Sequence, residues 1–523
     1  MRRRLPLLLS ASAFLALALP AWPVTMDQLG QEKGVPVHLQ DGQELTLSPP
    51  QLVSFGQQLF NAIWTTQDGA GRPLSNGLAG GPEIADLNHP LVFPRNINRI
   101  SGPEGNSCVE CHNTPRSGGG GGPSAVVFVG ANRFDFATFS RTDAVPNSGA
   151  VDSQGNPVTM QNIGDVRKSV GMFGSGFVEM LARQITADLQ AQRDATPPGG
   201  SANLTSKGIL FGTLIHRADG TWDCSQVAGL PEQSVATAGA ASPPSLIICP
   251  LHQSCTTVSL RQFTNDAFMA HIGIQPEERV GLGVDQDGDG FVNELTRADV
   301  TACTIFQATL PVPGRVMPSD PVVAMAASNG EMKFNQIGCA TCHVPSLPLT
   351  DRGWIYTEPS PYNPAGNLRL SDHVPTVSVD LTSPDLPQPR LSAVNGVVNV
   401  PAYTDFKLHD ITSGPDDPNR EPLDTNAAPN SPAFFAGNSR FLTRRLWGIA
   451  NQHTFGHHGQ YSTMRQAIEA HAGEAQAVTN AFKALSKYDQ DSIIEFLKTL
   501  QILPAGTPST VTFADAASPS AGR

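Results

Sequence analysis

Cys108-Val-Glu-Cys111-His112 and Cys339-Ala-Thr-Cys342-His343 are two copies of the spacing Cys-x-x-Cys-His. This spacing is typical of c-type haem attachment, in which each cysteine forms a thioether with a haem vinyl group and the histidine ligates the iron. A zinc site of four cysteines is the main alternative, but its two pairs usually lie about 15–20 residues apart. Here the pairs are about 230 residues apart. The sequence therefore predicts two covalently attached haem c groups, with His112 and His343 as iron ligands.

The start of the chain has the pattern of a secretory signal over residues 1–25. Three arginines, Arg2 to Arg4, precede a mostly apolar run from Leu5 to Leu19, and Ala21 is a small residue near the cleavage point. A membrane anchor is the alternative, but the apolar run is short for a span of about 20 residues. We expect a periplasmic or secreted protein with no membrane span once the signal is removed.

Length and composition predict several domains with many loops. The chain has 523 residues, among them 49 glycines and 44 prolines. The expected fold is mainly α, with two cytochrome-c-like haem domains, long loop-rich insertions and little β structure. The haem domains are expected at 26–325, with an insertion at 196–260, and at 326–503, followed by a disordered tail at 504–523. The net charge of −12 argues against a nucleic-acid partner.

A short phrase before each motif suggests an internal duplication. Gly56-Gln-Gln-Leu-Phe60 lies within an apolar-periodic stretch, residues 51–64, that predicts a helix. Gly330-Glu-Met-Lys-Phe334 resembles this phrase and ends five residues before Cys339. Further helices are expected at 299–310, 462–470 and 488–500.

Four cysteines remain outside the two motifs: Cys224, Cys249, Cys255 and Cys303. An even number of cysteines in an oxidising compartment suggests two disulfides. Three pairings are possible, and the sequence cannot choose among them. Buried free thiols are the alternative.

Residues 285–296 have the oxygen spacing of a calcium-binding loop. The ligands at positions 1, 3, 5 and 7 would be Asp285, Asp287, Asp289 and the backbone carbonyl of Phe291. Position 12 is Thr296 in place of the usual glutamate, so Glu294 or Asp299 would have to substitute for it. An acidic turn exposed to solvent, without a metal, is the alternative. A calcium ion here is expected to be structural.

The C-terminal part of the chain resembles a known family. The resemblance is carried by Leu446-Trp-Gly-Ile449, Phe455-Gly-His457-His458-Gly459, the stretch from Thr463 to Ile468, and His471-Ala-Gly-Glu-Ala475. These phrases are similar to those of the bacterial di-haem c-type oxidoreductases, described as thiol oxidoreductases or peroxidases. That family is related to di-haem cytochrome c peroxidases, to the methylamine-utilisation di-haem enzyme and to rubber oxygenases.

The resemblance implies a second ligand for the C-terminal haem. In related peroxidases, a methionine 14 residues after the histidine of a Phe-His-x-Gly phrase ligates the electron-transfer haem. The same count from His457 reaches His471. The resemblance thus implies a haem ligated by His343 and His471, with a lower reduction potential than a His/Met haem. A surface or capping histidine is the alternative for His471.

By the same resemblance, the N-terminal haem, with His112 as its proximal ligand, is the reaction centre. The segment from Arg167 to Glu179 resembles the family segment that follows the first haem. Glu179 is the candidate acid–base group for peroxide chemistry, and Arg167 is a candidate contact for a haem propionate. A salt-bridged surface position is the alternative for Glu179, and capping of a turn is the alternative for Arg167.

Three functions remain open. The first is a peroxidase-like oxidoreductase that reduces peroxide or another small oxidant at the N-terminal haem, with electrons passing through the C-terminal haem. The second is an oxygenase that cleaves an apolar organic substrate with dioxygen, and the third is an electron-transfer cytochrome. The expected partners are a small-molecule oxidant or organic substrate and a small electron-donor protein.

Overall fold

The computed structural model describes residues 29–71, 105–121, 126–129, 164–286, 289–421, 424, 426–427 and 431–509. The predicted signal at 1–25 and Asp287 of the calcium-like loop lie outside these residues. Helices make up 33% and strands 15% of the described residues. The prediction of a mainly α, cytochrome-c-like fold with little β is therefore wrong. Within the described part of the chain, no helix has the length and apolarity needed to cross a membrane.

The N-terminal motif is held by two helices that pack closely against each other. Helix α1 (Pro49–Asn61) begins with a capping box between Ser48 and Gln51 and has proline in its first turn. It packs on α9 (Arg297–Ala308). A Cβ on Gly56 would lie 2.0 Å from the carbonyl oxygen of Ala302, so only glycine allows this approach. The motif itself forms the short helix α3 (Cys108–Cys111).

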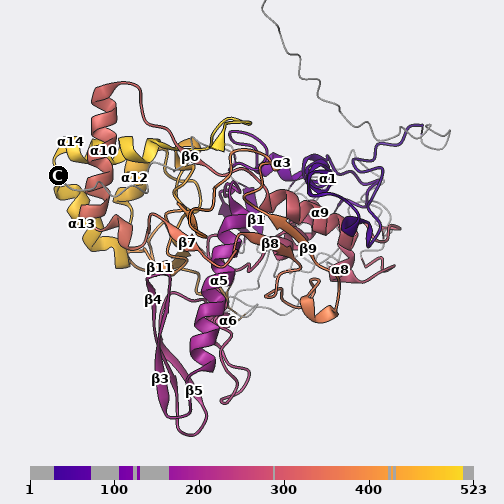
Figure 1. The fold of residues 1–523 in the computed structure, drawn as a ribbon, viewed down its shortest axis with the longest axis horizontal. Coiled ribbons are helices and arrows are strands. Elements are labelled where there is room, and N and C mark those ends of the chain that lie inside the picture. Colours follow the sequence, from indigo (N-terminus) through magenta and orange to yellow (C-terminus); the bar gives the residue numbers. More distant parts are fainter. Residues whose placement is uncertain are drawn as a thin grey trace, which may run out of the picture.

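The C-terminal motif is held in the same way. Helix α10 (Pro321–Gln336) packs on α14 (Lys487–Lys498). The motif cysteines follow α10 in the chain, in the 3₁₀ turn η7 (Cys339–Thr341) and the residue after it. A Cβ on Gly330 would lie 1.8 Å from the carbonyl oxygen of Ser492. The two arrangements lie at opposite ends of the molecule in Figure 1, with α1 and α9 on the right and α10 and α14 on the left. The duplication suggested by the two glycine–phenylalanine phrases thus has a structural counterpart.

A three-stranded antiparallel sheet replaces the loops expected at 196–260. Strands β3 (Gly200–Ser206), β4 (Ile209–His216) and β5 (Trp222–Val227) pair in chain order. Helix α5 (Ser175–Asp194) runs beside the sheet, and both project from the body of the molecule (Figure 1). Burial stabilises the sheet: Ile209 and Phe211, alternate residues of β4, are buried, and so is Leu214 at the register shift between Thr213 and Ile215. Gly208 and Gly220 lie in the turns between the strands, whereas Gly212 lies within β4.

Short strand pairs join distant parts of the loop-rich chain and account for most of the remaining β structure. They are β1 (Val126–Val129) with β2 (Gly164–Arg167), β6 (Gly314–Arg315) with β13 (Leu500–Gln501), β7 (Leu347–Leu349) with β10 (Val398–Val400), β8 (Ile355–Glu358) with β9 (Val377–Asp380), and β11 (Leu408–Asp410) with β12 (Arg440–Leu442). All five pairs are antiparallel.

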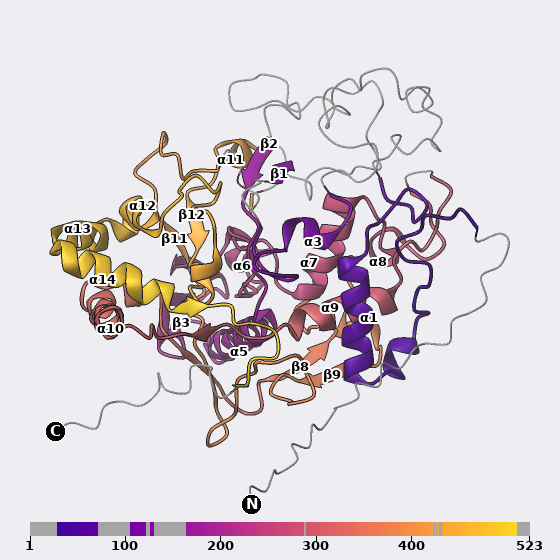
Figure 2. The ribbon, with the colours of Figure 1, turned by 90° about the horizontal axis from the view of Figure 1, so that it is seen from above.

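The other helices are mostly short. They are α6 (Glu232–Val235), α7 (Leu260–Ala267) with the π-helical turn Phe268–Ile272, α8 (Glu277–Val280), α11 (Pro432–Phe435), α12 (Met464–Glu469) and α13 (Gln476–Ala484), with 3₁₀ turns at Gln43–Leu45, Leu370–Asp372, Ile449–Asn451 and Gly473–Ala475. Seen from above, α3 and α7 lie between α1 and the C-terminal helices α12 to α14 (Figure 2).

Candidate functional site

The N-terminal motif presents its histidine in a defined orientation. The backbone N–H of His112 donates to the carbonyl of Cys108 at 2.9 Å, which closes the short helical turn. Its Nδ1 donates to the carbonyl of Gly119 at 3.2 Å. The ring of Phe60 from α1 lies 6.2 Å from the imidazole, centroid to centroid. With Nδ1 engaged in this way, Nε2 is the nitrogen available to a metal.

The C-terminal motif repeats each of these contacts. The backbone N–H of His343 donates to the carbonyl of Cys339 at 3.0 Å, and its Nδ1 donates to the carbonyl of Tyr403 at 3.3 Å. The ring of Phe334 from α10 lies 6.3 Å from the imidazole. The phenylalanines of the two repeated phrases therefore support the two motif histidines in matching positions.

The candidate iron ligands are neutral imidazoles. Burial lowers the pKa of His112 and of His343 to about 4 each. Burial also lowers the pKa of His471, whose Nδ1 donates to the carbonyl of Ala467 at 2.7 Å. His471 lies close enough to His343 for its charge to contribute to the lowered pKa of that residue. A neutral imidazole with Nδ1 bonded to a backbone carbonyl is the form that ligates metals.

One cavity, about 440 Å³ in volume, reaches both motifs. It brings together eight residues that the sequence singled out: Cys108, Cys111, His112, Arg167, Cys339, Cys342, His343 and His471. The two motifs, about 230 residues apart in the chain, thus face a common interior space. Phe263, Phe268 and Ile272 supply much of the apolar wall beside the N-terminal motif.

Four cationic side chains line the same cavity: Arg167, Lys168, Arg444 and Arg445. Glu421 forms an ion pair with Arg167 at 2.8 Å. Burial, with repulsion from Arg444, lowers the pKa of Lys168 to about 7 and that of Arg445 to about 9. Among the described residues, the buried Nη1 of Arg445 has no hydrogen-bond partner.

This excess of buried positive charge fits a cofactor that carries carboxylates. Each haem has two propionates, which would pair with Lys168, Arg444 and Arg445 and offset the cost of burying them. The two thiol pairs, the neutral imidazoles and the cations together have the chemistry that haem c requires. The residues lining the cavity therefore fit haem.

Glu179 does not line this cavity. Its carboxylate is fully buried and accepts hydrogen bonds from Arg183 Nη2 at 2.6 Å, the N–H of Leu260 at 2.8 Å and the hydroxyl of Tyr356 at 3.1 Å. It thereby joins α5 to Leu260, the first residue of α7, and Leu260 and Phe263 of that helix line the cavity. We assign Glu179 a structural role in positioning α7 and no acid–base step.

Replacing Glu179 with alanine should destabilise the protein by about 3–5 kcal/mol, because the buried Arg183 loses its closer carboxylate partner and keeps only Glu358 at 3.4 Å. Denaturant unfolding of the haem-loaded protein measures this. Asp194→Ala at the end of the same helix is the control, since its pair with Arg193 is 63% exposed on the aspartate side and should contribute about 1 kcal/mol or less. If Glu179→Ala keeps its stability but loses turnover, Glu179 is an acid–base group after all.

Sequence reasoning missed several polar residues of the cavity wall. His252 and Gln253 come from the loop before α7, His271 from the π-helical turn after it, and His457 from the C-terminal phrase. His457 Nδ1 donates to Gln253 Oε1 at 2.8 Å. His457 could have been predicted, because it belongs to the phrase Phe455-Gly-His457-His458-Gly459 that carries the family resemblance. The other three come from two segments, the loop with His252 and Gln253 and the turn with His271, and these meet the C-terminal phrase only in the folded chain.

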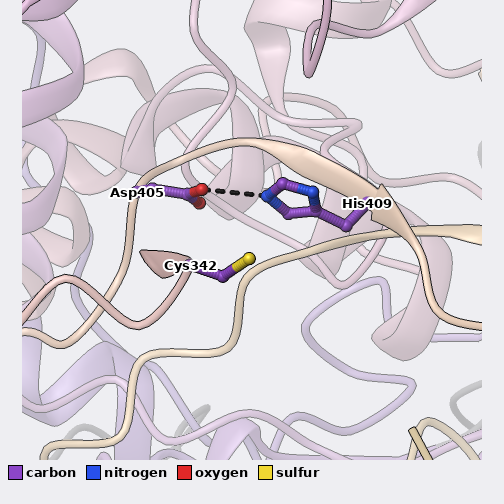
Figure 3. Close-up of side chains that lie close together, drawn as sticks. All are labelled: Cys342, Asp405 and His409. Carbon is purple, nitrogen blue, oxygen red and sulfur yellow. Dashed lines mark hydrogen bonds and ion pairs between the residues drawn. The ribbon is translucent and has the colours of Figure 1, made fainter. Parts of the chain in front are cut away.

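Beside the C-terminal motif, Cys342, Asp405 and His409 lie close together (Figure 3). Their sulfur, oxygen and nitrogen atoms all lie within 4.8 Å of one another, which is compatible with a small metal site. Cys342 is also one of the cysteines predicted to attach a haem, and a thioether there would remove the thiolate that such a metal would need. His409 donates to Asp405 Oδ2 at 2.9 Å and to Glu474 Oε2 at 2.7 Å.

Protonation of His409 should stabilise the fold. Burial opposes the charge, but hydrogen bonds to Asp405, Cys342 and Glu474 outweigh it and raise the pKa to about 11 from the ordinary 6.5. Because the folded-state pKa is raised, the contribution is complete below pH 6.5 and is lost as pH rises through 11. We expect the free energy of unfolding to fall more steeply between pH 7 and pH 10 in the wild type than in His409→Gln. Parallel curves would contradict this assignment.

The calcium-like loop is partly described. Asp285 accepts backbone N–H bonds from Asp289 and Gly290, and Gly290 has the positive φ of +92° that suits position 6. Glu294 accepts the N–H of Gln275 at 2.8 Å. Asp299 and Thr296 form the capping box at the start of α9. The carboxylate of Asp299 is therefore engaged in the cap and does not take the place of the glutamate at position 12.

The comparison with known families agrees with the residues described above. Residues 371–500 match the family described as "Di-haem oxidoreductase, putative peroxidase". The match covers Asp405, His409 and His471 and ends at Leu500, the first residue of β13. No curated protein matches the chain. Over these residues, the chain is similar to the di-haem oxidoreductase family.

Proposed function

We propose that the protein is a periplasmic di-haem c peroxidase-like oxidoreductase. One haem would be attached to Cys108 and Cys111 and the other to Cys339 and Cys342. The observation that carries the proposal is the shared cavity, which brings His471 close to His343 and His271 close to His112. On the family resemblance, which makes His471 the second ligand of the C-terminal haem, we assign electron transfer to that haem and the reaction to the N-terminal one.

Haem iron with an open coordination position supplies the two-electron reduction of a peroxide. The protein must then deliver protons to the leaving oxygen. We assign this task to His252, which lines the cavity and whose Nδ1 hydrogen-bonds the hydroxyl of Thr256 at 2.9 Å. Burial and the charge of Arg167 lower the pKa of His252 to about 3. Its neutral ring can therefore take a proton from the incoming peroxide and return it.

A second function is tested because apolar side chains form part of the cavity wall. Phe263, Phe268 and Ile272 would suit a hydrocarbon substrate, which supports an oxygenase that cleaves an apolar organic compound with dioxygen. Binding of such a compound would bury it against these side chains.

Two assays of the purified holoprotein separate the proposals. Steady-state turnover is measured with hydrogen peroxide and a reduced small electron-donor protein, and in parallel with an olefin under oxygen. The peroxidase proposal expects donor oxidation that depends on peroxide and no olefin cleavage. Olefin cleavage without peroxide turnover would replace it with the oxygenase, and inactivity in both would leave an electron-transfer cytochrome.

We further propose that the loop at 285–296 binds calcium as a structural ion, with Asp285, Asp287, Asp289 and the carbonyl of Phe291 as ligands. A bound ion offsets the repulsion among these carboxylates. A chelator should lower the melting temperature by a few degrees, and added calcium should restore it. Asp285→Asn should respond to neither treatment. A wild type equally insensitive to both would contradict the site.

A further inference from the structure

Cys249 and Cys255 are in contact at the two ends of a tight loop. The Sγ of Cys255 donates to the carbonyl oxygen of Cys249 at 2.7 Å, and each residue is 1% exposed. They form a small apolar cluster with Leu408 of β11. All eight cysteines are free thiols in this structure, so the two disulfides expected from the sequence are not formed.

The loop between these cysteines forms part of the cavity wall. Leu251, His252 and Gln253 all line the cavity. Gln253 Nε2 donates to the carbonyl of Lys168 at 2.8 Å, and the carbonyl of Gln253 accepts the N–H of Leu442 at 2.8 Å. The same side chain accepts from His457. The loop therefore joins the segment after the first motif to strand β12 and the C-terminal phrase.

We propose that Cys249 and Cys255 form a disulfide that fixes this part of the cavity wall. Two S–H bonds break and one S–S bond forms in the protein. The S–S bond of a disulfide oxidant breaks, and the oxidant takes up the two electrons and the two protons to become two thiols. Thiol–disulfide exchange of this kind is available to an exported chain.

The bond forms as the chain folds, before the loop is buried. In the folded protein, burial and a hydrogen bond with Cys249 raise the pKa of Cys255 well above its ordinary value, so little thiolate is available. The same burial would protect the finished disulfide from reductants. The other two cysteines are not placed to pair with each other. Cys224 lies half-buried on β5. Cys303 lies on α9, and its cysteine neighbour is Cys108, which we propose to be attached to haem.

The spacing of arginines allows a direct test. Trypsin releases residues 218–261 as one peptide that carries Cys224, Cys249 and Cys255, because no lysine or arginine lies between Arg217 and Arg261. The holoprotein, exported or refolded with oxidised glutathione, is denatured and alkylated without reductant. We expect one label on this peptide, at Cys224, and three labels after reduction. Three labels without reductant, or fragments that link Cys224 to either partner, would overturn the proposal.

Substitutions test the effect on the wall. Cys255→Ser should free Cys249, so that the peptide takes two labels without reductant, whereas Cys224→Ser should take none. The disulfide closes a small ring and restricts the unfolded chain, so Cys255→Ser should also lower the melting temperature by about 2–5 °C relative to Cys224→Ser. Equal melting temperatures in the two variants would contradict a role for the bond in fixing the loop.

Discussion

Replacing His112 with alanine is expected to lower peroxide turnover by roughly 100-fold or more, because it removes the imidazole that would ligate the reactive iron. Loss of a group that merely orients a metal ligand already costs about 10–100-fold. Cys108 and Cys111 are retained, so the experiment separates ligation from attachment. Turnover is measured per haem with peroxide and a reduced donor.

His216→Ala is the matched control for this variant. His216 lies on β4, stacked on Trp222 at 3.9 Å between ring centroids, and its Nδ1 donates to the carbonyl of Thr196. Its replacement should leave turnover near the wild-type value. If His112→Ala retains turnover while carrying both haems, the reaction centre lies elsewhere, and the asymmetry proposed for the two motifs is wrong.

Replacing His471 with methionine should raise the reduction potential of the C-terminal haem by about 0.1 V or more. A thioether stabilises the reduced iron more than an imidazole does, and axial ligands tune haem potentials over about 0.8 V. His471 lines the same cavity as His343, and its Nδ1 is held by Ala467. A spectroelectrochemical titration measures the two potentials separately.

His453→Met is the control for this substitution, since His453 is exposed and outside the cavity lining. It should leave both potentials unchanged. A His471→Met variant whose two potentials match those of the wild type would show that His471 does not ligate the iron at His343. In that case the family resemblance would fail at the residue on which the electron-transfer assignment depends.

Local sequence patterns predicted the parts of the fold that local interactions determine. The apolar period at 51–64 corresponds to α1 at Pro49–Asn61, and the stretch at 488–500 corresponds to α14 at Lys487–Lys498. Phe60 and Phe334 were found by comparing two short phrases, and both support a motif histidine. In each case the pattern lies within one turn or one helix.

Features that depend on contacts between distant segments were not predictable. The strands at 200–227 pack beside α5. The glycine and proline content of this stretch predicted loops, because composition contains no information about that contact. The cavity wall draws His252, His457 and Arg445 from three segments. Glu179 has the residue type of an acid–base group, but its hydrogen bonds to Arg183 and Tyr356 place it outside the cavity. Residue type alone cannot distinguish a glutamate that transfers protons in a cavity from one that is buried in a structural hydrogen-bond network.

Low-temperature electron paramagnetic resonance of the resting oxidised protein tests the central claim, which is that the two haems are unequal. We predict one low-spin signal from the haem ligated by His343 and His471 and one high-spin signal from the haem ligated by His112 alone. In His471→Ala, the low-spin signal should be lost while the original high-spin signal remains. Two low-spin signals in the wild type would mean that a protein ligand, such as His252 or His271, closes the N-terminal iron, and would contradict the assignment of that haem as the open reaction centre.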